Sequence, residues 1–80
     1  MIDQARIVLR GAHGGYDVRY EFPSGYIFIG KVVKSRRRWE YIFGGVKSAD
    51  TWKTQKVAVE ALVAINEAKH GPLSKRAGLS

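Results

Sequence analysis

Hydrophobic and polar residues alternate strictly between Tyr16 and Phe22, in the order YDVRYEF. Val18, Tyr20 and Phe22 take one side of this segment. The charged residues Asp17, Arg19 and Glu21 take the other side. A period of two is typical of a strand with one buried and one solvated face. We therefore expect a half-buried strand here.

Two further segments are rich in β-branched and aromatic residues, as strands are. They are Tyr26 to Lys34 and Trp39 to Phe43, preceded by turns at 23–25 and 35–37. Such short connections favour an antiparallel meander. Residues 7–9, Ile-Val-Leu, offer an extra N-terminal strand.

A helix is predicted after Thr54, whose hydroxyl can cap the first free amides. Apolar residues recur there at spacings of three and four, which gives one apolar stripe. The stripe comprises Val57, Ala58, Ala61, Leu62, Ile65 and Ala68. Lys69 and His70 suit the negative end of the helix dipole, and Gly71 with Pro72 ends the helix.

The expected fold is α+β: a three-stranded antiparallel sheet packed on one C-terminal helix. Residues 1–71 would form a single β-β-β-α domain, and residues 72–80 a flexible basic tail. Trp52 would close the end of the core. Val59 and Val63 lie beside the apolar stripe, as its edge or as a small dimer contact, so the protein is expected to be a monomer or a weak homodimer.

Composition limits the function classes. The 80 residues contain no cysteine, which excludes disulfides and thiolate metal sites. The first residues lack the apolar run of a signal peptide, and no segment is long enough to span a membrane. We therefore expect a cytoplasmic (intracellular) protein. The net charge is +7, which favours polyanions, with nucleic acid first.

Catalytic chemistry finds little support. The two histidines, His13 and His70, lie far apart, and no serine stands in a nucleophile motif. The segment Gly11 to Gly15 lacks the pattern of a phosphate-binding loop. The scattered carboxylates match no metal-ligand spacing. We expect no enzyme, no cofactor and no metal. A small nuclease that uses His13 as its acid is the weaker alternative.

The charge peaks in one segment of eight residues without an acid. Its basic residues are Lys31, Lys34, Arg36, Arg37 and Arg38. A hairpin would project these side chains, and a two-stranded ribbon fits the major groove of DNA. Trp39 adjoins the run and would stack on a base if it faced outward, or belong to the core if it did not. A solvated turn that protects the sheet edge is the plain interpretation of the same arginines.

The junction Asp50-Thr51-Trp52-Lys53-Thr54, followed by QKVAVEAL, resembles a known family type. Small, aromatic and Thr-capped positions in this order are similar to the DNA-binding domains of plant ethylene-response factors and of phage and transposon integrases. The likeness spans Tyr16 to Lys69. The chain also resembles small phage-encoded or actinobacterial proteins of unknown role.

The family resemblance implies that the outer face of the sheet lies in the major groove of DNA. It implicates Arg19, Lys31, Arg38 and Trp39. The first strand departs from the family because its two outward carboxylates would repel phosphate. This departure favours docking through the tip of the hairpin.

The predicted function is a non-enzymatic nucleic-acid-binding domain, phage-encoded and regulatory, with DNA preferred to RNA. A module that binds an acidic host protein is the alternative from another class. A double-stranded-RNA-binding domain is a further alternative, although it would need a helix before the strands. No membrane partner is expected.

Overall fold

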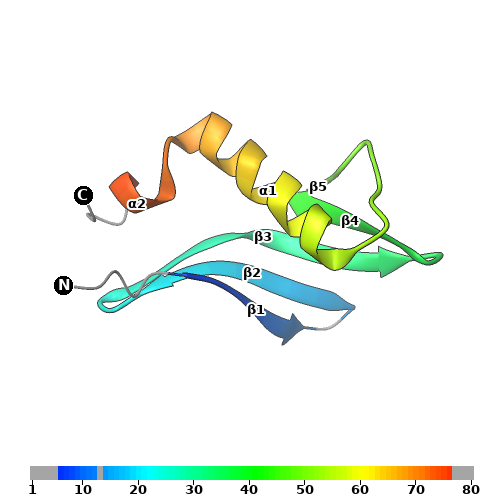
Figure 1. Ribbon diagram of the computed structural model, residues 1–80, viewed down its shortest axis with the longest axis horizontal. Helices are drawn as coiled ribbons and strands as arrows, with labels where there is room; N and C mark the ends of the chain where they lie inside the picture. Colours follow the sequence, from blue (N-terminus) through cyan, green and yellow to red (C-terminus); the bar gives the residue numbers. More distant parts are fainter. Residues whose placement is uncertain (1–5, 13, 77–80) are drawn as a thin grey trace.

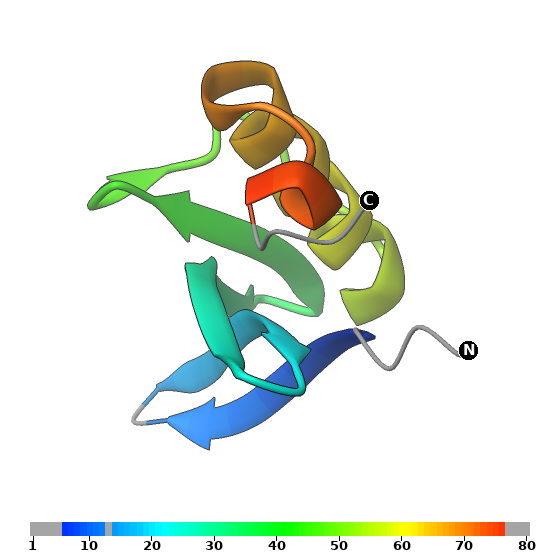
Figure 2. The ribbon, with the colours of Figure 1, turned by 90° about the vertical axis from the view of Figure 1, so that its left-hand side faces the viewer.

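The computed structural model describes residues 6–12 and 14–76. Five strands form one antiparallel sheet in the order β1-β2-β3-β4-β5, and two helices follow. The elements are β1 (Arg6–Ala12), β2 (Gly15–Phe22), β3 (Gly25–Ser35), β4 (Arg38–Phe43), β5 (Val46–Lys47), α1 (Gln55–His70) and α2 (Leu73–Arg76). The helices lie on one side of the curved sheet and leave the other side uncovered (Figures 1 and 2).

The α+β class is confirmed, but the sheet has five strands where the sequence predicted three with an optional fourth. The N-terminal strand exists and extends beyond residues 7–9. Gly11 belongs to β1 and Gly15 to β2, so the expected loop over 11–15 is much shorter. Strand β5 was missed because two residues are too few for a pattern of period two to be recognised.

Register confirms the two faces of β2. Val18 and Tyr20 lie across from Leu9 and Ile7 of β1, on the side of the sheet that faces α1. Successive side chains of a strand point to opposite faces of the sheet. Asp17, Arg19 and Glu21 alternate with Val18 and Tyr20, so they lie on the opposite, uncovered side. We call this uncovered side the outer face.

The core forms where α1 packs on β3 and β4 (Figure 2). Its buried members are Val18, Ile29, Val32, Ala58, Leu62 and Leu73. Gly30 permits the close approach of the helix, since a Cβ at this position would lie 2.9 Å from Leu62 Cδ1 and 2.7 Å from Ile42 O. The helix therefore needs a glycine in the middle of β3.

A bulge in β3 shifts the alternation of its side chains. Val18 lies opposite Gly30 and Arg19 opposite Phe28, so Ile29 is an extra residue. Ile29 and Gly30 are consequently both buried. The bulge keeps Phe28 on the outer face while the strand continues to bury Val32 beneath α1.

Both ends of α1 match the prediction. Val57 N donates to Thr54 Oγ1 at 3.3 Å, and Gly71 N donates to Glu67 O at 2.8 Å. Residues 73–76, which we expected to belong to a flexible tail, instead form α2. Leu73 is buried in the core, which ties α2 to the sheet and α1.

Candidate nucleic-acid interface

The turn between β3 and β4 has an unusual backbone. Ser35 pairs with Arg38, so Arg36 and Arg37 alone form the loop. Their φ angles are +52° and +69°, in the left-handed region. A two-residue hairpin loop of type I′ needs positive φ at both positions and favours Asn-Gly or Gly-Gly. Two consecutive arginines in this conformation carry a cost of about 1–3 kcal/mol each.

The β4–β5 hairpin of the same sheet has glycines at the two positions of its turn that require positive φ. Gly44 and Gly45 join β4 to β5 and have φ angles of +61° and +83°. The chain therefore places glycines in one tight turn and arginines in the other, under the same steric requirement. Strain at a turn that exposes two cations is a reason to look for function there.

The base of the β3–β4 hairpin is anchored to the segment that precedes α1. Trp39 N donates to Trp52 O at 2.7 Å, and Trp52 N donates to Trp39 O at 2.8 Å. Arg38 adds two side-chain bonds, from Nε to Thr51 Oγ1 at 2.5 Å and from Nη2 to Thr51 O at 2.9 Å. The hairpin thus has a fixed base beneath its exposed turn.

Four basic residues at this hairpin are exposed. We call them the basic turn: Lys34, Arg36, Arg37 and Arg38. The Trp39–Trp52 bridge adds Lys53 to this end of the molecule, one residue beyond the bridge. No acid lies in the first turn of α1, which starts close by (Figure 1). Sequence reasoning did not assign Lys53 to the site, because only the long-range bridge brings it there.

Arg19 and Lys31 lie apart from the basic turn, on the outer face. Both are half-buried, in the middle of β2 and β3. Of the two carboxylates expected to repel phosphate there, Glu21 is ion-paired with cations. Glu21 Oε2 lies 3.4 Å from Arg19 Nη2 and 3.5 Å from Arg10 Nη2. Two arginines face one carboxylate, which reduces the expected repulsion.

Trp39 lies on the opposite side of the sheet. It is half-buried, packs against the core and has its ring centroid 6.2 Å from that of Tyr16. Trp52 is also half-buried, and its ring stacks on Tyr41 at 5.5 Å with an interplanar angle of 18°. Both tryptophans therefore close the end of the core, which is the structural role that the sequence predicted for Trp52.

Two aromatic side chains on the outer face were not singled out from the sequence. Tyr26 is 53% exposed and Phe28 is 57% exposed. Register places them opposite Glu21 and Arg19. Their i, i+2 spacing puts both on one face of a regular strand, and this spacing was the signal that could have found them. The bulge at Ile29 made the face assignment of β3 ambiguous from the sequence.

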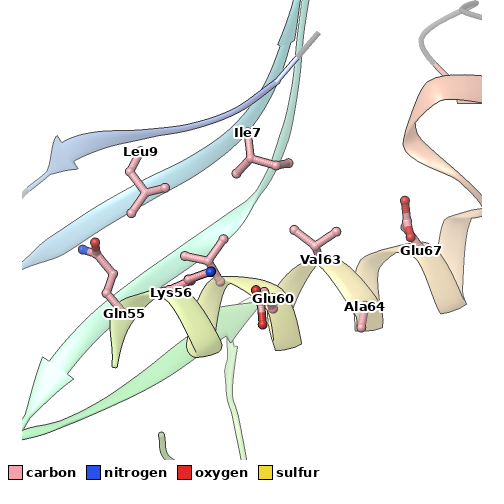
Figure 3. Close-up of a pocket in the computed structure, with 9 residues that line it drawn as sticks. Ile7, Leu9, Gln55, Lys56, Glu60, Val63, Ala64 and Glu67 are labelled. Atoms are coloured by element: carbon pink, nitrogen blue, oxygen red, sulfur yellow. The ribbon is translucent and has the colours of Figure 1, made fainter. Parts of the chain in front are cut away.

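An open groove of about 570 Å³ lies between α1 and β1 (Figure 3). Val63 of the helix faces Ile7 and Leu9 of the strand across it, and Val59 also lines the groove. These valines are half-buried at the edge of the apolar stripe. The charged residues that line the groove are one cation, Lys56, and two acids, Glu60 and Glu67, so the groove does not extend the basic site.

Other candidate chemistry finds no support among the described residues. His13 lies outside them, and His70 sits at the end of α1 with its ring 6.1 Å from that of Phe43. The described part of the chain holds no group of three or more His, Cys, Asp or Glu side chains that could bind a metal ion. Within residues 6–12 and 14–76, no helix is long and apolar enough to cross a membrane.

Comparison of the chain with protein-family models, with curated proteins and with solved structures finds no match.

Proposed function

We propose that the protein is a non-enzymatic nucleic-acid-binding domain, with DNA as its target, and that the basic turn of the β3–β4 hairpin contacts phosphates. The observation that carries this proposal is the Arg36-Arg37 loop. Its two residues are exposed and have positive φ, where glycine or asparagine would be less strained.

The surroundings of the loop support the same function. Lys34 and Arg38 flank it on neighbouring strands, and Lys53 follows the segment that anchors the hairpin. Residues 34–39 contain no acid. Cations gathered on a rigid projection neutralise phosphates and release counterions, which gives binding that depends strongly on salt. A turn needed only for solubility would not require arginine at both strained positions.

The experiment compares the protein with the variant Arg36→Asn/Arg37→Gly. Fluorescence anisotropy with labelled DNA is recorded between about 50 and 200 mM salt. If about five phosphates are contacted, log K falls against log salt with a slope of about −4 to −5 for the protein. The variant should bind at least about tenfold more weakly at low salt, with a slope less negative by about 2.

The control is Lys69→Gln/Lys75→Gln, which removes the same charge from exposed positions at the far end of α1 and in α2. Its affinity should remain within about twofold of the unchanged protein. Equal losses in both variants would mean that net charge alone attracts DNA, and would refute a site at the turn. Binding without salt dependence, or cellular partners retained after nuclease treatment, would favour an acidic protein partner instead.

A further inference from the structure

We infer that the outer face of the sheet binds the bases of a single-stranded nucleic acid by stacking on Tyr26 and Phe28. This inference rests on the proposed function and deepens it, because it names the form of nucleic acid. The basic turn holds phosphates, which duplexes and single strands both offer. Only a single strand presents the flat faces of its bases.

The two rings are accessible because no helix of the described structure covers the outer face. Both helices lie on the opposite side (Figures 1 and 2), and Tyr26 and Phe28 are 53% and 57% exposed. They project from β3, whose backbone at these positions pairs with Glu21 and Arg19 of β2. A fixed backbone holds both rings in a constant orientation, as a stacking surface requires.

Arg19 places a positive charge beside both aromatic rings. Its guanidinium carbon lies 4.2 Å from the centroid of the Tyr26 ring, in a cation–π contact. The same side chain lies across from Phe28 in register. One cation therefore lies beside both rings, where it can contact a phosphate of a strand whose bases stack on them.

Further cations surround the pair. Arg6 and Arg10 lie on the outer face of β1 and are exposed. Glu21 is the carboxylate closest in register, opposite Tyr26, and it is ion-paired with Arg10 and Arg19. Cations in excess over carboxylates make this end of the face complementary to phosphate rather than to an acidic or apolar protein surface.

The path of the strand follows from the geometry of β3. Phe28 and Arg36 are eight residues apart, which corresponds to about 26 Å at about 3.3 Å per residue. A single strand stacked on the aromatic pair would reach the basic turn by running along β3. That length corresponds to a site of several nucleotides, within the range of about 4–16 known for single-strand binding surfaces.

The test uses Tyr26→Thr/Phe28→Thr, since threonine retains a high strand propensity on an exposed face. Anisotropy is measured with a labelled 12-nucleotide single strand and with a duplex of the same sequence, each as DNA and as RNA. The variant should lose at least about tenfold in affinity for single strands and less than twofold for duplexes, with an unchanged salt slope. Of the single substitutions at position 28, Phe28→Thr should weaken single-strand binding, whereas Phe28→Trp, which keeps an aromatic ring, should retain it.

The matched control is Val46→Thr, which changes another exposed apolar side chain, 68% exposed, on β5. It should leave both affinities unchanged. Single-strand affinity within twofold of the unchanged protein in Tyr26→Thr/Phe28→Thr would overturn the stacking surface, as would equal losses on duplex and single strand. The proposed function would survive either result if Arg36→Asn/Arg37→Gly still weakened binding. If no nucleic acid bound at all, both would fail.

Discussion

Trp39 and Trp52 form an antiparallel bridge through two reciprocal backbone hydrogen bonds of 2.7 and 2.8 Å. This bridge joins the start of β4 to the segment that leads into α1. It fixes the base of the β3–β4 hairpin and the first turn of the helix against each other, so that the basic turn projects from a rigid support. The two tryptophans are partly buried and pack against the core.

The strained turn should limit the stability of the protein. Replacing Arg36 with Asn and Arg37 with Gly gives the pair preferred in type I′ loops and removes the repulsion of two adjacent charges. We expect the free energy of unfolding to rise by about 1–2 kcal/mol, and Tm to rise by about 4–8 °C per kcal/mol. Denaturant unfolding measures the change. Opposite changes in stability and in DNA affinity would show that the arginines serve binding; a loss of stability would contradict the strain.

Glu21, one of the two outward carboxylates of β2, should weaken nucleic-acid binding. Glu21→Gln frees Arg10 and Arg19 from their ion pairs and adds one positive charge to the outer face. We expect affinity to rise about two- to fivefold at low salt, and stability to change by less than about 1 kcal/mol. The matched control is Glu60→Gln on the exposed side of α1, which alters the net charge equally. An identical gain in both variants would argue against contact with the outer face.

The close approach of α1 to the sheet should depend on Gly30. Gly30→Ala places a methyl group against Ile42 O and the Leu62 side chain, at 2.7 and 2.9 Å. We expect a loss of about 1–3 kcal/mol in the free energy of unfolding, because the core must shift to admit it. Gly11→Ala is the control, since a Cβ there meets nothing within 4 Å. Thermal and denaturant unfolding of the two variants should separate them clearly.

The short helix α2 should contribute to the fold through a buried amide. Arg76 Nη1 donates to Asn66 Oδ1, and the Asn66 side chain belongs to a residue only 2% exposed. Arg76→Ala leaves that oxygen without its partner, which should lower stability by about 1–3 kcal/mol. Lys75→Ala removes a neighbouring exposed charge and should change stability by less than about 0.5 kcal/mol. Equal effects would mean that the hydrogen bond adds nothing.

Local patterns in the sequence predicted much of the fold. Period-two alternation located β2, and the Thr54 cap with the apolar stripe located α1, because these signals depend on neighbours within one element. Strand β5 and helix α2 escaped prediction, since each is too short to show a period. Leu73 is held by the core rather than by helix propensity.

The candidate site shows the same division. The sequence by itself determined that basic residues cluster at the turn of a hairpin, because charge and turn length can be counted along the chain. Only the tertiary structure decided what surrounds that turn. Positive φ at Arg36 and Arg37 follows from the pairing of Ser35 with Arg38, which leaves only two residues in the loop. The Trp39–Trp52 bridge brings Lys53 to the same end of the molecule. The bulge at Ile29 and the position of α1 left Tyr26 and Phe28 exposed, since a face becomes inner or outer only when a helix covers one of the two.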